Sequence, residues 1–252
     1  MNRYIIRKEF KESLFDSRGL WMIVASAIVL SGLCFLVTNI KEGSVLAQND
    51  ILQYAMKAVL FLTLTVSMVL GSASFASERE ENTMESLLLT PVSKLSLAMA
   101  KYLGVMVIGI LLLVVSVPYL AAIGAGSVLT GRAVFMTFFG GILLLIAFVA
   151  ISIVLSILMA SSKASIMTSI LVMVVLTFPA MIQGLFKLSP VGLAILKIDP
   201  VACCFNMMGK LLADNAALFS LGSYILPLVL FAAACLALMA FASRKIALKG
   251  EK

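Results

Sequence analysis

Six long stretches of this chain contain no charged residue, and they restrict its fold more than any other feature. They cover residues 19–40, 58–77, 102–131, 133–162, 164–186 and 215–243. A helix needs about 20 apolar residues to cross the hydrocarbon core of a bilayer. The third and fourth stretches also contain loop residues, so we expect those spans nearer 103–123 and 134–158. The sequence predicts an all-α integral membrane protein with six transmembrane helices in one domain, 19–243.

The composition supports this fold class and removes several functions. Hydrophobic residues make up 62% of the chain and charged residues only 12%, whereas a soluble domain has about 25% charged residues. The chain has no histidine, so chemistry that needs imidazole is excluded. Its four cysteines lack C-x-x-C spacing, which argues against a zinc site. The chain has no block of basic residues that would indicate nucleic-acid binding. We also expect no metal or cofactor on this chain.

The basic residues predict the orientation in the membrane. With six spans and an inner N-terminus, 13 of the 19 lysines and arginines fall on the cytoplasmic side. Cytoplasmic loops of membrane proteins carry such an excess. We therefore expect a multi-pass protein of the cell membrane with both termini in the cytoplasm. Residues 244–252 form a basic cytoplasmic tail.

The first 18 residues carry eight charges, unlike a signal peptide, whose short basic start precedes an apolar stretch. Ile6, Phe10 and Leu14 recur every four residues, with Tyr4 and Phe15 beside them. This spacing predicts an amphipathic helix over 1–18 that lies on the inner membrane surface.

The segment between the second and third spans is unusual for a cytoplasmic loop. Asn82 is a good N-cap, and Glu85 three residues later can complete a capping box. Met84, Leu87 and Leu88 then form an apolar stripe at helical spacing. The pattern predicts a helix of about two turns outside the bilayer.

A second helix start follows directly. Thr90 can act as a cap with Pro91 at the first helical position, which predicts a new helix that runs through Lys101 into the third span. Residues 78–94 can be interpreted as a solvated linker, but a linker has no need of exposed leucines. An exposed apolar patch more often marks a docking surface.

These residues resemble the permease subunits of ABC-2-type transporters. Glu78-Arg79-Glu80, Thr83, Leu87-Leu88, Thr90-Pro91 and Lys101 match the pattern E-R-E-x-x-T-x-x-x-L-L-x-T-P…K. Glycine usually precedes that threonine, where this chain has Asn82. The six spans, the amphipathic start and a long outer segment, 187–222, also resemble that family.

The resemblance implies a permease that pairs with two copies of an ATP-binding subunit and with a second permease, identical or different. ATP and Mg²⁺ belong to the partner subunit, so this chain is not an enzyme. The coupling loop, 78–101, includes a short coupling helix that docks on the ATPase. The residues that inherit this coupling role are Glu78, Arg79, Glu80, Thr83, Glu85, Leu87, Leu88, Thr90 and Pro91.

The chain does not resemble an ATPase itself. Its nearest match to a P-loop, residues 126–133, lacks the lysine and the hydroxyl residue that follows it. No charged residue lies within the core of a predicted span, which disfavours an ion-coupled transporter.

Hydroxyl residues in the second and fifth spans allow two interpretations. Small hydroxyl residues let membrane helices approach closely, so packing is the simpler one. The resemblance places these two spans near a permease dimer axis, so some of the side chains could line an apolar pathway. The candidates are Thr63, Ser67, Ser74, Thr168, Ser169 and Thr177.

The outer segment 187–222 resembles the short re-entrant helices at the outer end of this family's pathway. Ile195, Ile198, Val201 and Phe205 are spaced loosely like a helix face, which Pro190 and Pro200 interrupt.

Four sulfur atoms gather within this segment, on Cys203, Cys204, Met207 and Met208. Soft sulfur ligands suit Cu(I), but Cys and Met in such chains usually serve packing.

The predicted function is a permease subunit of an ATP-driven exporter whose substrate is a lipid, a drug or a peptide. The alternative is a membrane scaffold or sensor that docks a cytoplasmic partner through residues 78–94.

Overall fold

The computed structural model describes residues 17–38, 45–81, 83, 93–125, 127, 129–183, 190–214 and 222–246. The described chain is almost entirely helical, because a segment that crosses a bilayer has to pair its backbone polar groups within itself. Its helices are α2 (Ser17–Thr38), α3 (Val45–Glu80), α5 (Lys94–Ile123), α6 (Thr130–Leu158), α7 (Ser162–Ile182), α8 (Pro190–Ile198), α9 (Pro200–Asp214), α10 (Gly222–Ala242) and the 3₁₀ turn η2 (Ser243–Lys245).

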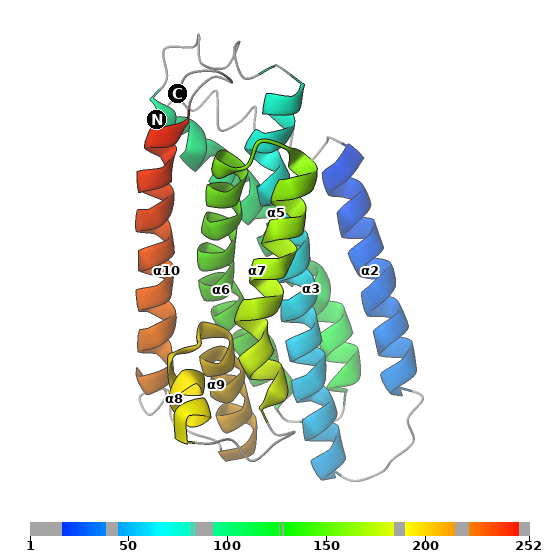
Figure 1. The fold of residues 1–252 in the computed structure, drawn as a ribbon. Helices are drawn as coiled ribbons and strands as arrows, with labels where there is room; N and C mark the ends of the chain where they lie inside the picture. Colours follow the sequence, from blue (N-terminus) through cyan, green and yellow to red (C-terminus); the bar gives the residue numbers. More distant parts are fainter. Residues whose placement is uncertain are drawn as a thin grey trace.

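Six of these helices are long and apolar enough to cross a membrane, which confirms the predicted fold class. They are Gly19–Leu36, Asp50–Glu80, Lys94–Ile123, Thr130–Leu158, Ser162–Met181 and Gly222–Ala242. They alternate in direction, so the start of α2 and the end of α10 lie at the same end of the bundle (Figure 1). The same end holds the last turn of α3 and the first turn of α5.

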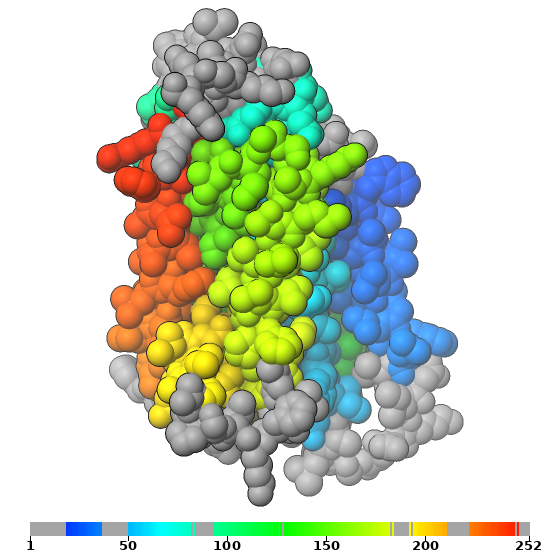
Figure 2. Space-filling view, viewed as in Figure 1, coloured from blue at the N-terminus to red at the C-terminus, as the bar shows by residue number. Residues whose placement is uncertain are grey.

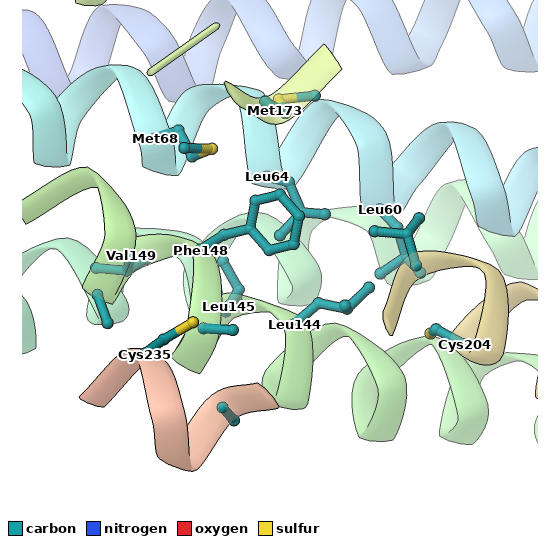
Figure 3. Close-up of a cluster of buried hydrophobic side chains, with 14 of the residues drawn as sticks. Leu60, Leu64, Met68, Leu144, Leu145, Phe148, Val149, Met173, Cys204 and Cys235 are labelled. Atoms are coloured by element: carbon teal, nitrogen blue, oxygen red, sulfur yellow. The ribbon is translucent and has the colours of Figure 1, made fainter. Parts of the chain in front are cut away.

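Helices α3 and α6 form the centre of the bundle. Figure 3 shows Leu60, Leu64 and Met68 of α3 beside Leu144, Leu145 and Phe148 of α6. These side chains are almost completely buried. The cluster also receives Met173 from α7, Cys204 from α9 and Cys235 from α10.

Small residues let α3 and α6 approach closely. A Cβ atom at Gly71 would lie 2.0 Å from Ser152 Oγ, so only glycine fits there. One turn further along each helix, Ser156 Oγ accepts hydrogen bonds from the backbone amides of Phe75 at 2.8 Å and Ala76 at 3.1 Å. Small-residue contacts and interhelical hydrogen bonds are the usual means of joining helices in a bilayer.

The outer helices present apolar side chains to their surroundings. In Figure 2, α2 and α10 form the two edges of the visible face, with α7 between them. On α7 the exposed side chains Met167, Leu171, Val175 and Phe178 follow helical spacing. On α2, Trp21 is 71% exposed. Such faces are expected of helices that contact lipid.

Helices α8 and α9 lie at the end of the bundle opposite the end of α10 (Figure 1). Each begins with a proline, Pro190 or Pro200, because proline is well suited to the first position of a helix. Asp199 Oδ2 accepts a hydrogen bond from the amide of Ala202 at 2.8 Å, which caps α9. The segment 187–222 thus contains two short helices, and its place on the outer side of the membrane stays a prediction.

The structure differs from the sequence analysis at the edges of the coupling loop, 78–101. Glu78, Arg79 and Glu80 belong to the last turn of α3, and α5 begins at Lys94. Its N-cap is Ser93, whose side chain accepts a hydrogen bond from the amide of Ser96. The prediction of Thr90 as the cap of this helix was wrong, because Ser93 supplies the same chemistry closer to the span.

Several predicted features lie outside the described residues. They are the amphipathic stripe of 1–18, the capping box of Asn82 and Glu85, and most of the basic tail 244–252. The coupling helix also falls there.

Candidate functional site

The charged end of α3 is the part of the predicted site that the structure describes best. The helix ends in a turn stabilised by Thr83, whose amide and hydroxyl both donate to the carbonyl oxygen of Glu78, at 3.0 and 3.3 Å. Arg79 lies in this last turn, where a cation interacts favourably with the helix dipole. The turn places Glu78 and Arg79 against neighbouring helices.

Glu78 connects α3 to α5. Its Oε1 atom lies 2.6 Å from Nζ of Lys101, in an ion pair that is also a hydrogen bond. Lys101 is only 5% exposed, and its ammonium group lies 5.3 Å from the centre of the Phe75 ring. Removing one partner from a buried pair leaves a charge without compensation, so this contact holds α5 to α3 firmly.

Arg79 connects α3 to α6. Its Nη1 atom donates to the carbonyl oxygen of Met159 at 2.7 Å, and its Nη2 atom donates to that of Ile157 at 3.0 Å. Met159 is the C-cap of α6, and the last carbonyls of a helix have no partner within the helix. The guanidinium fork supplies two donors in a fixed geometry, so it satisfies both.

Together Glu78, Arg79 and Lys101 make a charged junction of three helices, α3, α5 and α6. Residues 82–92, which contain the predicted coupling helix, follow it directly along the chain. The junction therefore links the helix before that segment to the helix after it and to α6.

Of the other predicted coupling residues, the structure describes Glu80 and Thr83. Both are exposed at the end of α3. Glu85, Leu87, Leu88, Thr90 and Pro91 lie outside the described residues, so their role stays a prediction.

Lys101 matches the family pattern but was not among the predicted site residues. A single lysine two turns inside an apolar helix was the available signal, because a charge at that depth needs a partner.

The candidate pathway residues lie mainly between the helices of this one chain. Thr63, Ser67, Ser169 and Thr177 are buried. Ser74 and Thr168 are half-buried, and their hydroxyls donate to the carbonyls of Gly71 and Ala164 in their own helices.

The contact between α3 and α7 shows how such hydroxyl residues pack. Thr65 Oγ1, beside the candidates, donates to Phe61 O and lies 3.4 Å from Met173 Sδ of α7. The geometry agrees with helix packing, and a pathway role stays a prediction.

The sulfur cluster of α9 packs against α6. A Cβ atom at Gly140 would lie 2.5 Å from Cys204 Sγ, 3.3 Å from the methyl of Met208 and 3.5 Å from that of Met207. Burial raises the pKa of the Cys204 thiol to about 12, and the neighbouring Cys203 adds to the shift. Metal ions bind the thiolate rather than the thiol. Within the part of the chain that the structure describes, His, Cys, Asp and Glu form no group of three that could hold a metal.

The fold and the junction together identify the chain as a polytopic helical membrane protein. Its second span ends in a charged connection to its third and fourth spans. The sequence profile of the ABC-2 family transporter protein matches residues 14–180, well over half of the chain. The chain belongs to the ABC-2 transporter family, with a role as a membrane permease component. A comparison with curated proteins found no match.

Proposed function

We propose that this chain is the permease subunit of an ATP-driven exporter and works with two ATP-binding subunits and a second permease. The observation that carries the proposal is the charged junction at the end of α3. It joins three spanning helices immediately before the segment predicted to dock on the ATPase. Family membership supports the permease role, and the ATP-binding partner, its copy number and the direction of transport are part of the proposal.

In this proposal ATP and Mg²⁺ bind the partner subunits, whose closure displaces the coupling helix. Leu87 and Leu88 enter an apolar groove of the ATPase, while Glu80, Thr83, Glu85, Thr90 and Pro91 shape the loop around them. Glu78 and Arg79 pass the displacement to α5 and α6. The spanning helices offer an apolar environment, which suits a hydrophobic or amphipathic substrate such as a lipid, a drug or a peptide.

The test is the double variant Leu87→Asp/Leu88→Asp. Burying a leucine contributes roughly 1.5–3 kcal/mol, and an unpaired charge in an apolar groove is costly. We expect the variant to insert in the membrane but to lose co-purification with a P-loop ATPase and the ATP hydrolysis of the complex. The matched control is Leu87→Met/Leu88→Met, which keeps the apolar surface.

If the double aspartate variant retained the ATPase at the wild-type level, the segment would be only a linker. Capture of a cytoplasmic partner without ATPase activity would instead favour the scaffold or sensor. Co-purification and hydrolysis should be measured on the same samples.

The proposed orientation, with both termini in the cytoplasm, has a separate test. In a variant without the four native cysteines, single cysteines at Asp50 and Asn215 should react with an impermeant thiol reagent applied to intact cells. A cysteine at Asn82 should react only after the membrane is permeabilised. Labelling at Asn82 in intact cells would reverse the orientation.

A further inference from the structure

A groove lies between the first turn of α5 and the end of α10, away from the charged junction. It has a volume of about 630 Å³, within the range of small-ligand sites. Figure 1 shows the end of α10 close to the start of α5 at this end of the bundle. The groove is lined mainly by Lys94, Leu95, Ala237, Ala240, Phe241 and Arg244.

Two cationic side chains line this groove. Lys94 and Arg244 come from different helical elements and are both exposed. Neither forms an ion pair with any residue that the structure describes. Lys101, two turns further along α5, is already paired with Glu78. The groove therefore presents two positive charges that its own described surroundings leave uncompensated.

The floor of the groove is apolar. Leu95 is 46% exposed and Phe241 is 62% exposed, and Ala237 and Ala240 leave room between them. Ser243 also lines the groove, but its hydroxyl donates to the carbonyl of Ala240 and the residue is 1% exposed. The floor belongs to two helices that are long enough and apolar enough to span a membrane.

We propose that this groove binds an anionic phospholipid. The headgroup phosphate lies between Lys94 and Arg244, and an acyl chain covers Leu95 and Phe241. Basic pockets between transmembrane helices at the cytoplasmic side bind anionic headgroups in this way. The inference goes beyond the proposed transport function and does not depend on the ATPase, since it needs only this end of the bundle to lie at the membrane surface.

A second cavity shows why the cations matter. It has a volume of about 300 Å³ and lies between α2, α3 and α5, lined by Leu30, Tyr54, Tyr119 and other uncharged residues. The described residues of its lining carry no charged side chain, so nothing among them favours an anionic ligand. The groove at Lys94 differs because charge and apolar surface occur together.

The experiment is native mass spectrometry of the purified chain with added phosphatidylglycerol or phosphatidylcholine. We expect the wild type to bind phosphatidylglycerol at least tenfold more tightly. Lys94→Gln and Arg244→Gln should each weaken that binding about fivefold, and the double variant about twentyfold or more. The matched control is Lys163→Gln, which removes an exposed lysine from the same end of the bundle and should leave binding unchanged.

Two further arms test whether the groove itself holds the lipid and whether the acyl chain is required. Ala237→Phe fills the groove without a change in charge and should abolish the preference for phosphatidylglycerol. Soluble glycerol phosphate should not displace the lipid, because it lacks the acyl chain. Equal binding of both lipids, an equal loss in Lys163→Gln, full binding by Ala237→Phe or displacement by glycerol phosphate would each overturn the proposal.

Discussion

The two ends of the helix bundle are held together by different kinds of contact. Where α3 ends, Glu78 and Arg79 reach α5 and α6 through an ion pair and two charged hydrogen bonds. At the opposite end, α9 packs on α6 through buried cysteine and methionine side chains. Its polar contacts there include the cap at Asp199 and the amide pair of Gln183 and Asn206.

The two kinds of contact differ in how they transmit a displacement of one helix to its neighbours. Charged hydrogen bonds are directional and roughly twice as strong as neutral ones, so α3 cannot shift at its charged end without moving α5 and α6. Apolar packing is non-directional, so α9 can adjust against α6 by rearranging side chains, particularly its flexible methionines. Substitutions at each end should therefore differ in the size and the reach of their effects.

The largest effect should follow from Glu78→Gln. The change removes the carboxylate that pairs with the buried ammonium of Lys101, and breaking such a pair typically costs about 3–5 kcal/mol. Thermal unfolding of the purified protein in detergent should show a marked loss of stability. The control is the exposed neighbour Glu80. The free energy of unfolding of Glu80→Gln should stay within about 0.5 kcal/mol of that of the wild type.

The double variant Glu78→Gln/Lys101→Met sharpens this prediction. It removes both charges and should recover most of the lost stability, because an apolar pair of similar volume can replace a buried ion pair. A double variant no more stable than Glu78→Gln would show that the ion pair is not the cause.

A smaller effect is expected for Arg79→Gln. Each hydrogen bond from a charged group contributes about 1.5–3 kcal/mol, and two carbonyls at the end of α6 would lose such a donor. Hydrogen exchange should become faster in the last turn of α6 and in the first turn of α7. Arg79→Lys should restore only part of the protection, since a single ammonium does not reproduce the guanidinium fork.

At the other end of the bundle, Asp199→Ala should lower the free energy of unfolding by about 0.5–2 kcal/mol, which is the usual effect of losing an N-cap. Hydrogen exchange should increase over 201–204 and remain unchanged at the end of α6. Asp199→Asn keeps the acceptor and should behave nearly as the wild type at acidic pH, where the Asp199 carboxyl is protonated. An equal loss in both variants would mean that the carboxylate charge, rather than the cap, stabilises α9.

Burial raises the pKa of the Asp199 carboxyl, and its hydrogen bonds from the amides of Ala202 and Val201 only partly oppose the shift. The folded state therefore holds this proton more strongly than the unfolded state does. The stability that Asp199 contributes is complete below its unfolded pKa and declines as the pH rises through its folded pKa. Relative to Asp199→Asn, the wild type should thus lose stability over that rise, measured by thermal unfolding at each pH.

The smallest effect is expected for substitutions in the sulfur cluster that test for metal binding. Replacing Cys203 and Cys204 with alanine, and Met207 and Met208 with leucine, should leave the copper tolerance and copper content of expressing cells unchanged. The reason is that Cys204, Met207 and Met208 fill space around Gly140 of α6, while Cys203 donates to carbonyls of α8. A loss of copper tolerance with normal expression would assign the cluster a metal role.

The fold class could be predicted from the sequence because it depends on a property of single stretches. A bilayer requires every backbone polar group to be paired within the membrane, so a long apolar stretch without charges has to be helical. The six spans follow from this requirement alone. The ends of the helices are harder to predict, because several neighbouring residues offer the same capping chemistry. The cap of α5 at Ser93 is an example.

Composition and spacing along the chain specify the six spans, the excess of basic residues on one side of the predicted topology and the pattern from Glu78 to Pro91. The packed fold is needed to bring Glu78 to Lys101, Arg79 to the carbonyls of α6, and Lys94 and Arg244 to the two sides of one groove. These contacts join residues from 23 to about 150 positions apart, which no local pattern reports. Composition and periodicity report the surroundings of each helix, whereas its neighbours are selected by packing, above all where Gly71 allows α3 to approach α6.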